Sequence, residues 1–314
     1  MTQRLALGID IGGTNTSYGI VDRRGSIVAK GTMPTTGHPT VEGYVTALAA
    51  TLAPLLEEAG PENIAGAGIG APNGNFFTGE ILFAPNLPWK GVAIPLVKLL
   101  TTALNMPCKL TNDANAAAVG EMTYGTARGM NDFVMVTLGT GVGSGFVANG
   151  QIIYGHDGFA GELGHMIAVR DGRMCGCGRR GCLEAYCSAT GIVITAKEWL
   201  KQRDTQSVLR DNADTLTARR IQEAAVAGDT LALELFAYTG KILGQTLADV
   251  VVITSPEAIV FFGGLAHAGE LLFAHVRKHM EDNMLNIFKN KVALKTSSLP
   301  DADAAILGAS ALVW

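Results

Sequence analysis

The sequence predicts an α/β protein made of two domains. Short apolar segments typical of strands alternate with longer segments whose apolar residues recur at helical spacing. A strand, a glycine-rich turn and a second strand occur at the start of the chain and again after residue 132, and aligning Gly12 on Gly139 superposes both hairpins. This repeat predicts an internal duplication in which each half begins with the same unit.

The first half alternates strands and helices after an opening three-stranded segment. Apolar runs bounded by Gly, Asp or Pro indicate the strands. One helix ends before Gly60 and Pro61, as helices commonly do. The expected strands are residues 5–11, 17–21, 27–33, 64–71 and 108–111, and the expected helices are 41–58, 95–104 and 114–124.

The second half repeats the opening hairpin and is then mostly helical. Its expected strands are 133–138, 144–147, 151–154 and 258–262, and its expected helices are 221–227, 231–252, 271–280 and 302–312. No linker rich in Pro, Ser or charge separates the halves, so the boundary is expected inside a helix near residues 114–130. We expect an N-terminal domain over 1–118, onto which the helix at about 302–314 packs back, and a larger C-terminal domain over 119–301.

Composition excludes several classes of protein. A net charge of −4 over 314 residues argues against non-specific nucleic-acid binding, which needs a basic surface. The N-terminus lacks the apolar run of a signal peptide, and no run of ~18 apolar residues predicts a membrane span. We therefore expect a cytoplasmic protein. The 39 glycines fit either tight turns in a compact α/β fold or places where the backbone approaches a ligand closely.

The first glycine turn, residues 12–15, follows the first strand and contains Gly12, Gly13, Thr14 and Asn15. Amides in such a turn can point at a phosphate, and Asp10 at the strand end could hold Mg²⁺ through water. No Gly-Lys-Ser/Thr follows, so this is not a Walker A motif, and a strand follows where a Rossmann fingerprint needs a helix. Taken alone, the turn is equally well read as a hairpin with a capping Asp.

Two further glycine turns also follow buried strands. The second glycine turn, residues 139–145, has glycine at every second position, and the third is Gly263 with Gly264. Side chains are missing from one face of the second turn, which suits a polyphosphate, and a flat ring could lie on the third. Together the three turns predict one nucleotide held between the two halves. Its expected contacts in the second and third turns are Gly139, Thr140, Gly141, Gly263 and Gly264.

Asn112 and Asp113 stand between an expected strand and an alanine-rich helix. Asp near a helix N-terminus is commonly a cap. The functional reading is a carboxylate on the floor of a cleft that accepts a proton from a sugar hydroxyl, with Asn112 orienting the same hydroxyl.

The most specific pattern is one His and three Cys with metal-ligand spacing. The four expected ligands are His165, Cys175, Cys177 and Cys182. Four protein ligands leave no coordination position open for substrate or water, which indicates a structural zinc ion. The alternative is a loop of reduced, unligated cysteines. Glu162 and Glu184 flank the ligands, so an ion that fixes the loop would fix both carboxylates, which are acceptors for the hydroxyls of a polyol.

These motifs resemble the ROK family of sugar kinases and repressors, and the match covers the whole chain. The pattern Glu-x-Gly-His followed by Cys-x-Cys-Gly-x-x-Gly-Cys-x-Glu is highly specific to that family. The resemblance implies an actin-like, hexokinase-type (ribonuclease H-like) fold of two α/β domains around a cleft. It also implies an ATP-dependent hexose kinase with Mg²⁺ and a structural zinc. Within the family, the segments around Asn86 and residues 159–165 are most similar to bacterial glucokinases.

The resemblance further implies roles for individual residues. Asp113 would be the base, and His165 would face zinc with one ring nitrogen and a sugar hydroxyl with the other. The implied sugar contacts are Gly74, Asn86, Asn112, Asp113, Glu162, His165 and Glu184. The family is usually dimeric or tetrameric, so a homodimer or homotetramer is implied.

Several alternatives remain at this point. Kinases for N-acetylmannosamine, N-acetylglucosamine, allose and fructose share these motifs. A ROK repressor carries a winged-helix domain ahead of the first strand, but only nine residues precede Asp10 here. A sugar sensor without turnover is disfavoured by the intact Asp10 and Asp113. Because the metal loop is separate from the glycine turns in sequence, loss of zinc is expected to impair sugar binding more than nucleotide binding.

Overall fold

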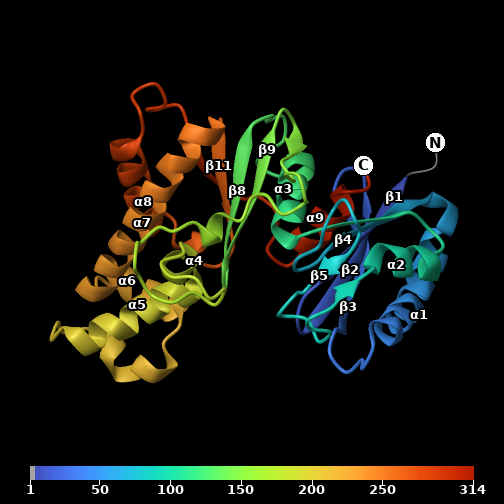
Figure 1. The fold of residues 1–314 in the computed structure, drawn as a ribbon, viewed down its shortest axis with the longest axis horizontal. Helices are drawn as coiled ribbons and strands as arrows, with labels where there is room; N and C mark the ends of the chain where they lie inside the picture. The colour runs from blue at the N-terminus through green and yellow to red at the C-terminus, as the bar shows by residue number, and fades with distance from the viewer. Residues whose placement is uncertain (1–3) are drawn as a thin grey trace. The chain divides into compact units, whose positions relative to one another are not determined.

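The structure is a computed structural model that describes residues 4–314 and divides into two compact units (Figure 1). Unit 1 comprises the chain up to Met130, Gln151–Gly161 and Ser298–Trp314, and unit 2 comprises Asn131–Gly150 and Glu162–Ser297. The expected boundary after residue 118 lies within a helix of unit 1. That unit continues to Met130, and the helix packs on the C-terminal helix of the same unit. The N-terminal segment in which no signal peptide is expected includes residues 1–3, which lie outside the described range.

Unit 1 is built on a five-stranded sheet. The strand order is β3 (Ile27–Pro34), β2 (Asn15–Asp22), β1 (Leu5–Ile11), β4 (Ile64–Gly70) and β7 (Cys108–Thr111). β1 pairs antiparallel with β2 and parallel with β4, and β4 pairs parallel with β7. The carboxyl ends of β1, β4 and β7 therefore meet at one edge of the sheet.

Helices cover both faces of this sheet. The helices are α1 (Val41–Ala59), α2 (Leu96–Leu104), α3 (Asp113–Tyr124) and α9 (Ala304–Ala311). Leu7 and Ile9 of β1 join the buried cluster under α1 and α2. Gly8 between them points to the opposite face, where a Cβ would lie 2.2 Å from the carbonyl oxygen of Ile306 in α9. Glycine thus lets α9 pack directly on the sheet. The remaining short elements are η1 (Pro61–Asn63), β5 (Ile81–Leu82), β6 (Ala93–Ile94) and β10 (Gln151–Ile152).

Unit 2 repeats the central strand order of unit 1. Its strands are β9 (Val142–Ala148), β8 (Phe133–Leu138), β11 (Ala258–Phe262) and β12 (Ala293–Thr296). β8 pairs antiparallel with β9 and parallel with β11, and β11 pairs parallel with β12. The same sequence of pairings joins β2, β1, β4 and β7, which confirms the duplication at the level of topology. The edge strand β12, which is mostly exposed, was not expected from the sequence.

The core of unit 2 lies between its sheet and its long helices. The helices are α4 (Glu184–Cys187), α5 (Ala189–Gln202), α6 (Ala218–Val226), α7 (Thr230–Thr254) and α8 (Glu270–Asn283), with short turns η2 (Leu163–His165), η3 (Val208–Thr215) and η4 (Ala266–Ala268). Gly240 and Gly244 let α8 approach α7 closely, since a Cβ on Gly244 would lie 2.5 Å from the Val276 carbonyl oxygen. Within the described residues, no helix has both the length and the apolar character that a membrane span requires.

Candidate active site and metal centre

The first glycine turn joins β1 to β2 and has little space around it. The Gly12 amide donates to the Asn15 carbonyl at 3.0 Å, and the Thr35 amide donates to Thr14 at 2.8 Å. A Cβ on Gly13 would lie 2.5 Å from the carbonyl oxygen of Asn86. The structure therefore brings the expected sugar contact Asn86 against the first glycine turn, although Asn86 follows Gly13 by 73 positions in the sequence.

Two neighbouring polar residues, Asn112 and Asp113, lie at the start of α3, and one of them caps the helix. Asn112 is the N-cap residue, and its Oδ1 accepts a hydrogen bond from the Asn115 amide at 2.7 Å. Asp113 is the first residue of the helix, and its Oδ1 accepts from the Ala114 amide at 2.9 Å. The reading of Asp113 as the cap is thus wrong. The Asp113 side chain is exposed, so a substrate can reach its carboxylate.

Asp10 and Asp113 lie at the carboxyl ends of strands on either side of β4. A Cβ on Gly70, at the end of β4, would lie 3.5 Å from Asp10 Oδ1 and 3.9 Å from the Asp113 Cα. Loss of hydration, with the Asp113 charge as second cause, raises the pKa of Asp10 to about 6. Asp113 is itself accessible, but loss of hydration among crowded neighbours raises its pKa too. Both carboxyls are therefore poised to titrate above the usual range for Asp.

These shifts predict an acid limb in the activity. A proton acceptor works only when ionised, so kcat/KM for the phosphoryl acceptor should fall as the pH is lowered through the raised pKa of Asp113. Asp10, whose pKa is raised to about 6, becomes protonated as the pH falls below that value. The measurement is a pH–rate profile, with circular dichroism at each pH to show that the protein stays folded. A folded enzyme with an undiminished rate at about pH 4.5, close to the ordinary range of Asp, would contradict this assignment.

Gly74 also reaches this edge of unit 1. A Cβ there would lie 2.6 Å from the carbonyl oxygen of Thr111, the last residue of β7. Thr111 immediately precedes the Asn112 and Asp113 pair. Unit 1 therefore gathers at one edge of its sheet the residues expected from sequence to bind sugar and nucleotide, which are Asp10, Gly12, Gly13, Thr14, Asn15, Gly74, Asn86, Asn112 and Asp113.

The second glycine turn in unit 2 is held by Glu184. Glu184 Oε2 accepts a hydrogen bond from the Val142 amide at 3.0 Å. A Cβ on Gly141 would lie 2.3 Å from the same oxygen, so glycine is required for this approach. The two residues that form the hydrogen bond are 42 apart, and sequence reasoning assigned Glu184 to the sugar alone. The structure joins the expected sugar residue to the expected phosphate turn.

Helix α5 supports the same turn from its N-terminus. The Ala189 amide donates to the Gly139 carbonyl at 2.9 Å, and the Thr190 hydroxyl donates to the Thr140 carbonyl at 2.9 Å. Ala189 and Thr190 were not expected from the sequence. Ser188 is nevertheless a recognisable start signal for α5, which it caps by accepting from the Gly191 amide.

The third glycine turn adjoins the second. Gly263 has a positive φ of +100°, and a Cβ there would lie 2.8 Å from the Leu138 carbonyl oxygen at the end of β8. The Leu265 amide donates to that same carbonyl at 3.1 Å. Gly264 has open space above its backbone. The two turns that sequence assigned to one nucleotide therefore lie side by side in unit 2.

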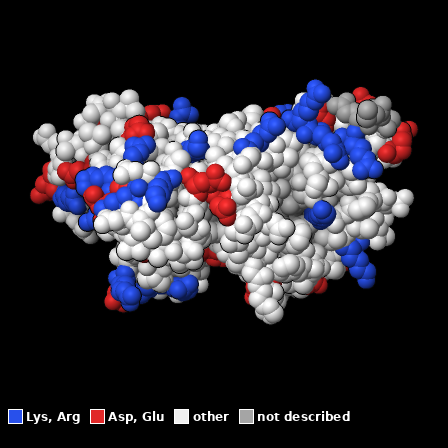
Figure 2. All heavy atoms as spheres, turned by 90° about the horizontal axis from the view of Figure 1, so that it is seen from above, with Lys and Arg blue, Asp and Glu red and all other residues white. Residues whose placement is uncertain are grey.

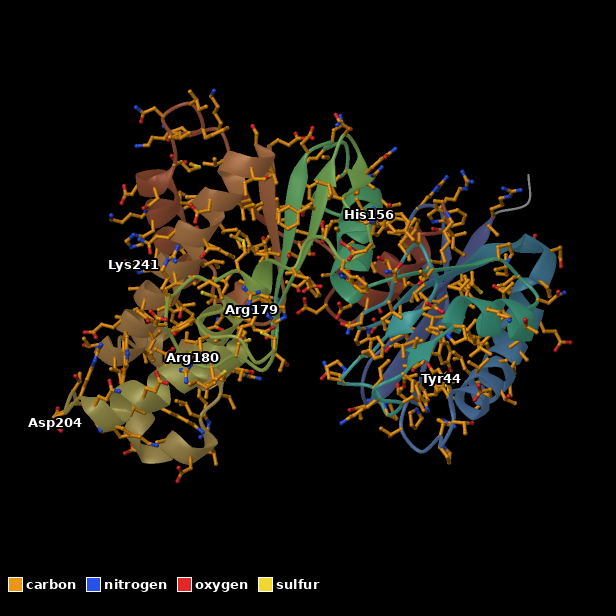
Figure 3. The ribbon with its side chains drawn as sticks, viewed as in Figure 1. Tyr44, His156, Arg179, Arg180, Asp204 and Lys241 are labelled. Carbon is orange, nitrogen blue, oxygen red and sulfur yellow. The ribbon has the colours of Figure 1, made fainter. Side chains whose placement is uncertain are left out.

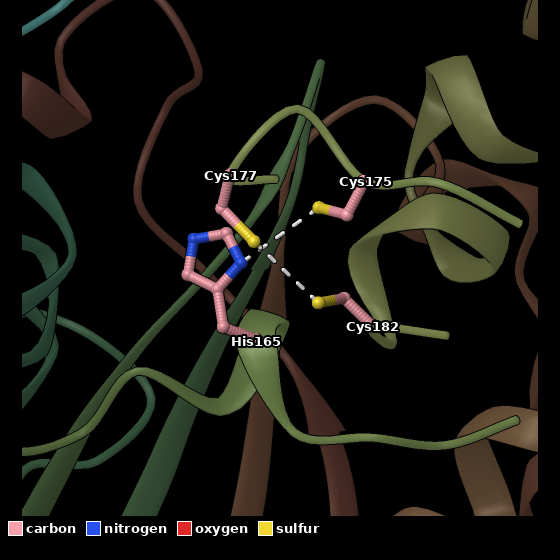
Figure 4. Close-up of side chains that lie close together, drawn as sticks. All are labelled: His165, Cys175, Cys177 and Cys182. Atoms are coloured by element: carbon pink, nitrogen blue, oxygen red, sulfur yellow. Dashed lines mark hydrogen bonds between the residues drawn. The ribbon is translucent and has the colours of Figure 1, made fainter. Parts of the chain in front are cut away.

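The four expected metal ligands converge in space (Figure 4). Their donor atoms all lie within 4.8 Å of one another, with Cys177 Sγ 3.6 Å from Cys182 Sγ and Cys175 Sγ 3.9 Å from His165 Nδ1. Zn–S bonds of about 2.3 Å in a tetrahedron place ligand atoms about 3.8 Å apart, whereas a disulfide needs about 2.05 Å. The residues fit a tetrahedral zinc ion and leave the other ring nitrogen of His165 for another partner.

The loop that carries these ligands, residues 165–182, is called the metal loop here. Arg179 and Arg180 mark it in Figure 3. The Cys175 amide donates to the Arg179 carbonyl at 2.8 Å, and Arg179 Nη1 donates to the His165 carbonyl at 3.2 Å. Cys175 Sγ lies 3.7 Å from Glu184 Oε1. The carboxylate that holds the second glycine turn is therefore also in contact with a metal ligand.

Two surface features lie apart from these residues. A cavity of about 600 Å³ opens between α6, α7 and α8, and none of the residues that line it belongs to the expected nucleotide set. Figure 2 shows Lys and Arg side chains interspersed with Asp and Glu on the face in view, with wide uncharged areas between them.

Comparison with known proteins places this geometry in context. Residues 6–314 match the model of the ROK family. The chain is 35% identical over 311 residues to a glucokinase of Thermotoga maritima, covering 98% of this chain and 96% of the relative. It is 33% identical to an N-acetylmannosamine kinase of Shigella boydii, covering 98% and 97%. A solved ROK family glucokinase from Streptomyces griseus, in complex with glucose and AMPPNP, matches at 33% identity with a TM-score of 0.80 over 98% of both chains.

Proposed function

The chain belongs to the ROK family, and we propose that it transfers the γ-phosphoryl group of ATP to the 6-hydroxyl of glucose. The observation that carries this function is the position of Asp113. Its exposed side chain stands on the first turn of α3, and a Cβ on Gly70 would approach both Asp10 and Asp113. A carboxylate so placed can accept the proton of an attacking hydroxyl.

The remaining residues of unit 1 have complementary roles in this proposal. The Asn112 oxygen is engaged as the cap of α3, so its amide group remains to donate to a sugar oxygen. Amides of the first glycine turn would bind phosphate oxygens. Asp10, crowded by the Asp113 charge, would hold Mg²⁺ through water, and the bound ion would neutralise charge on the phosphates.

Unit 2 would supply the other contacts to both substrates. Glu162, His165 and Glu184 would accept or donate hydrogen bonds to sugar hydroxyls, and the second and third glycine turns would bind the nucleotide. A structural zinc held by the His165 Nδ1 and three thiolates would fix the ring of His165, with Nε2 left for the sugar. As the resemblance implies, we also propose a homodimer or homotetramer, which light scattering would test.

A panel of hexoses tests the substrate. We expect magnesium-dependent ADP release with glucose, and much less with fructose or with N-acetylhexosamines, because the glucokinase-like segments include Asn86 and His165. The measurement is a coupled assay at matched sugar concentrations. Faster turnover of N-acetylmannosamine would overturn the choice of sugar and leave the kinase assignment intact. Sugar binding without any release of ADP would instead support a non-catalytic sensor.

A further inference from the structure

Arg173 lies in the metal loop, but its side chain is directed away from the four ligands. Its guanidinium reaches the junction of α4 and α5, where Nη1 donates to the Ala185 carbonyl at 2.9 Å and to the Gly191 carbonyl at 3.1 Å. Nη2 donates to the Thr195 hydroxyl at 2.9 Å and to Glu198 at 2.7 Å. Only 13% of the side chain is exposed.

The ring of Tyr186 completes this arrangement. The Arg173 guanidinium stacks on that ring with 4.4 Å between its central carbon and the ring centroid. The Arg173 amide donates to the Tyr186 hydroxyl at 2.7 Å. The ion pair with Glu198 is half-exposed on the glutamate side and contributes little, whereas the carbonyl bonds are enclosed. The guanidinium fork thus binds backbone at the end of one helix and the start of the next.

Helix α4 depends on such support because it has only four residues, Glu184–Cys187. A single turn is too short to be stable by itself, and its terminal carbonyls have no partners within the helix. Arg173 and Tyr186 hold the C-terminal side of this turn. Glu184 is its first residue, and the carboxylate of Glu184 holds the Val142 amide of the second glycine turn.

We propose that Arg173 is a positioning residue for sugar binding, acting through α4 on the carboxylate of Glu184. The inference rests on the proposed function, in which Glu184 binds the sugar. Arg173 is not one of the four expected metal ligands, and its guanidinium acts on α4 through the Ala185 carbonyl. The metal loop would therefore be held in two ways, by an ion at the four ligands and by the hydrogen bonds of the Arg173 guanidinium.

The test is glucose affinity in a double-mutant cycle. We expect Arg173→Met to weaken glucose binding about tenfold, because several hydrogen bonds from a charged donor are lost, while one zinc per chain is retained. In the Glu184→Gln background the same change should have little further effect, because the carboxylate that it positions is already gone. Titration calorimetry gives the affinities, and metal analysis gives the zinc content.

Two further variants sharpen the test. Arg173→Lys keeps the charge but not the fork, so it should resemble Arg173→Met, and it carries the test if the methionine variant fails to fold. Arg203→Met is the matched control, because Arg203 also stacks on a ring, 3.7 Å from Trp199, and pairs with Glu234. It should bind glucose normally.

Equal losses of affinity in the wild-type and Glu184→Gln backgrounds would overturn the proposal, as would normal affinity in Arg173→Lys. Failure of the proposed function is recognised separately, because the unmodified enzyme would then not phosphorylate glucose at all.

Discussion

Replacement of Asp113 by Asn is expected to lower kcat by about 10²–10⁴-fold, the usual range for loss of a general base. ATP binding should be nearly unchanged. The attacking hydroxyl keeps its proton until the bond to phosphorus forms, so the base acts late and contributes to kcat. Steady-state rates and ATP-analogue titration measure the two effects.

The melting temperature distinguishes a catalytic role of Asp113 from a structural role as a helix cap. The folded-state pKa of Asp113 is raised, so the carboxyl favours the folded state most below the ordinary Asp pKa, and that contribution is lost as the pH rises through the raised value. At neutral pH the ionised carboxylate of Asp113 destabilises the folded state. The melting temperature of Asp113→Asn should therefore equal or exceed that of the wild type.

Asn112→Ala is the matched control at the next position. Asn112 is the N-cap of α3, so its loss should cost about 1 kcal/mol of stability and lower Tm. A near-normal rate in Asp113→Asn, or a melting temperature that falls as it does in Asn112→Ala, would contradict the catalytic assignment.

The metal site could be predicted from the sequence because its residues lie close together in the chain. The four metal ligands lie within eighteen consecutive positions, and the donor atoms converge as the spacing predicted. The actin-like, hexokinase-type fold class is confirmed by the match to a ROK family glucokinase over 98% of both chains. Each glycine turn follows a buried strand, and in unit 2 the neighbouring strands β8 and β11 bring the second and third turns side by side.

The sequence could not decide which of two adjacent polar residues caps a helix. It also could not predict contacts between residues that are far apart in the chain. Asn112 and Asp113 are both good caps, and only the backbone shows that Asn112 is the cap and Asp113 the first helical residue. The contact between Glu184 and Val142 joins a helix start to a turn 42 residues earlier. Helix α4 has four residues and no periodicity to detect.

The contact between Glu184 and Val142 also changes what loss of the metal should do. From sequence, zinc loss was expected to affect the sugar strongly and ATP little. Because Glu184 touches Cys175 on one side and holds the second glycine turn on the other, disorder in the metal loop should reach that turn as well. We therefore expect a smaller but measurable rise in the KM for ATP beside a large rise for the sugar.

Replacement of Cys177 by Ala is the direct experiment. We expect it to remove the bound zinc and to raise the sugar KM about tenfold or more, because His165 and Glu184 lose their fixed aim and each charged hydrogen bond is worth about 1.5–3 kcal/mol. Cys177 is exposed, so its replacement leaves no cavity in the core. Metal analysis and steady-state kinetics with each substrate varied are the measurements.

Cys108→Ser is the control, because Cys108 is a half-buried thiol of unit 1 outside the cluster, and its sulfur donates to the Met106 carbonyl at 3.5 Å. It should keep one zinc per chain and both KM values. An active wild-type preparation without zinc would contradict the metal assignment. An unchanged sugar KM in Cys177→Ala would show that the metal loop does not aim the sugar-binding residues, whether or not the ion is bound.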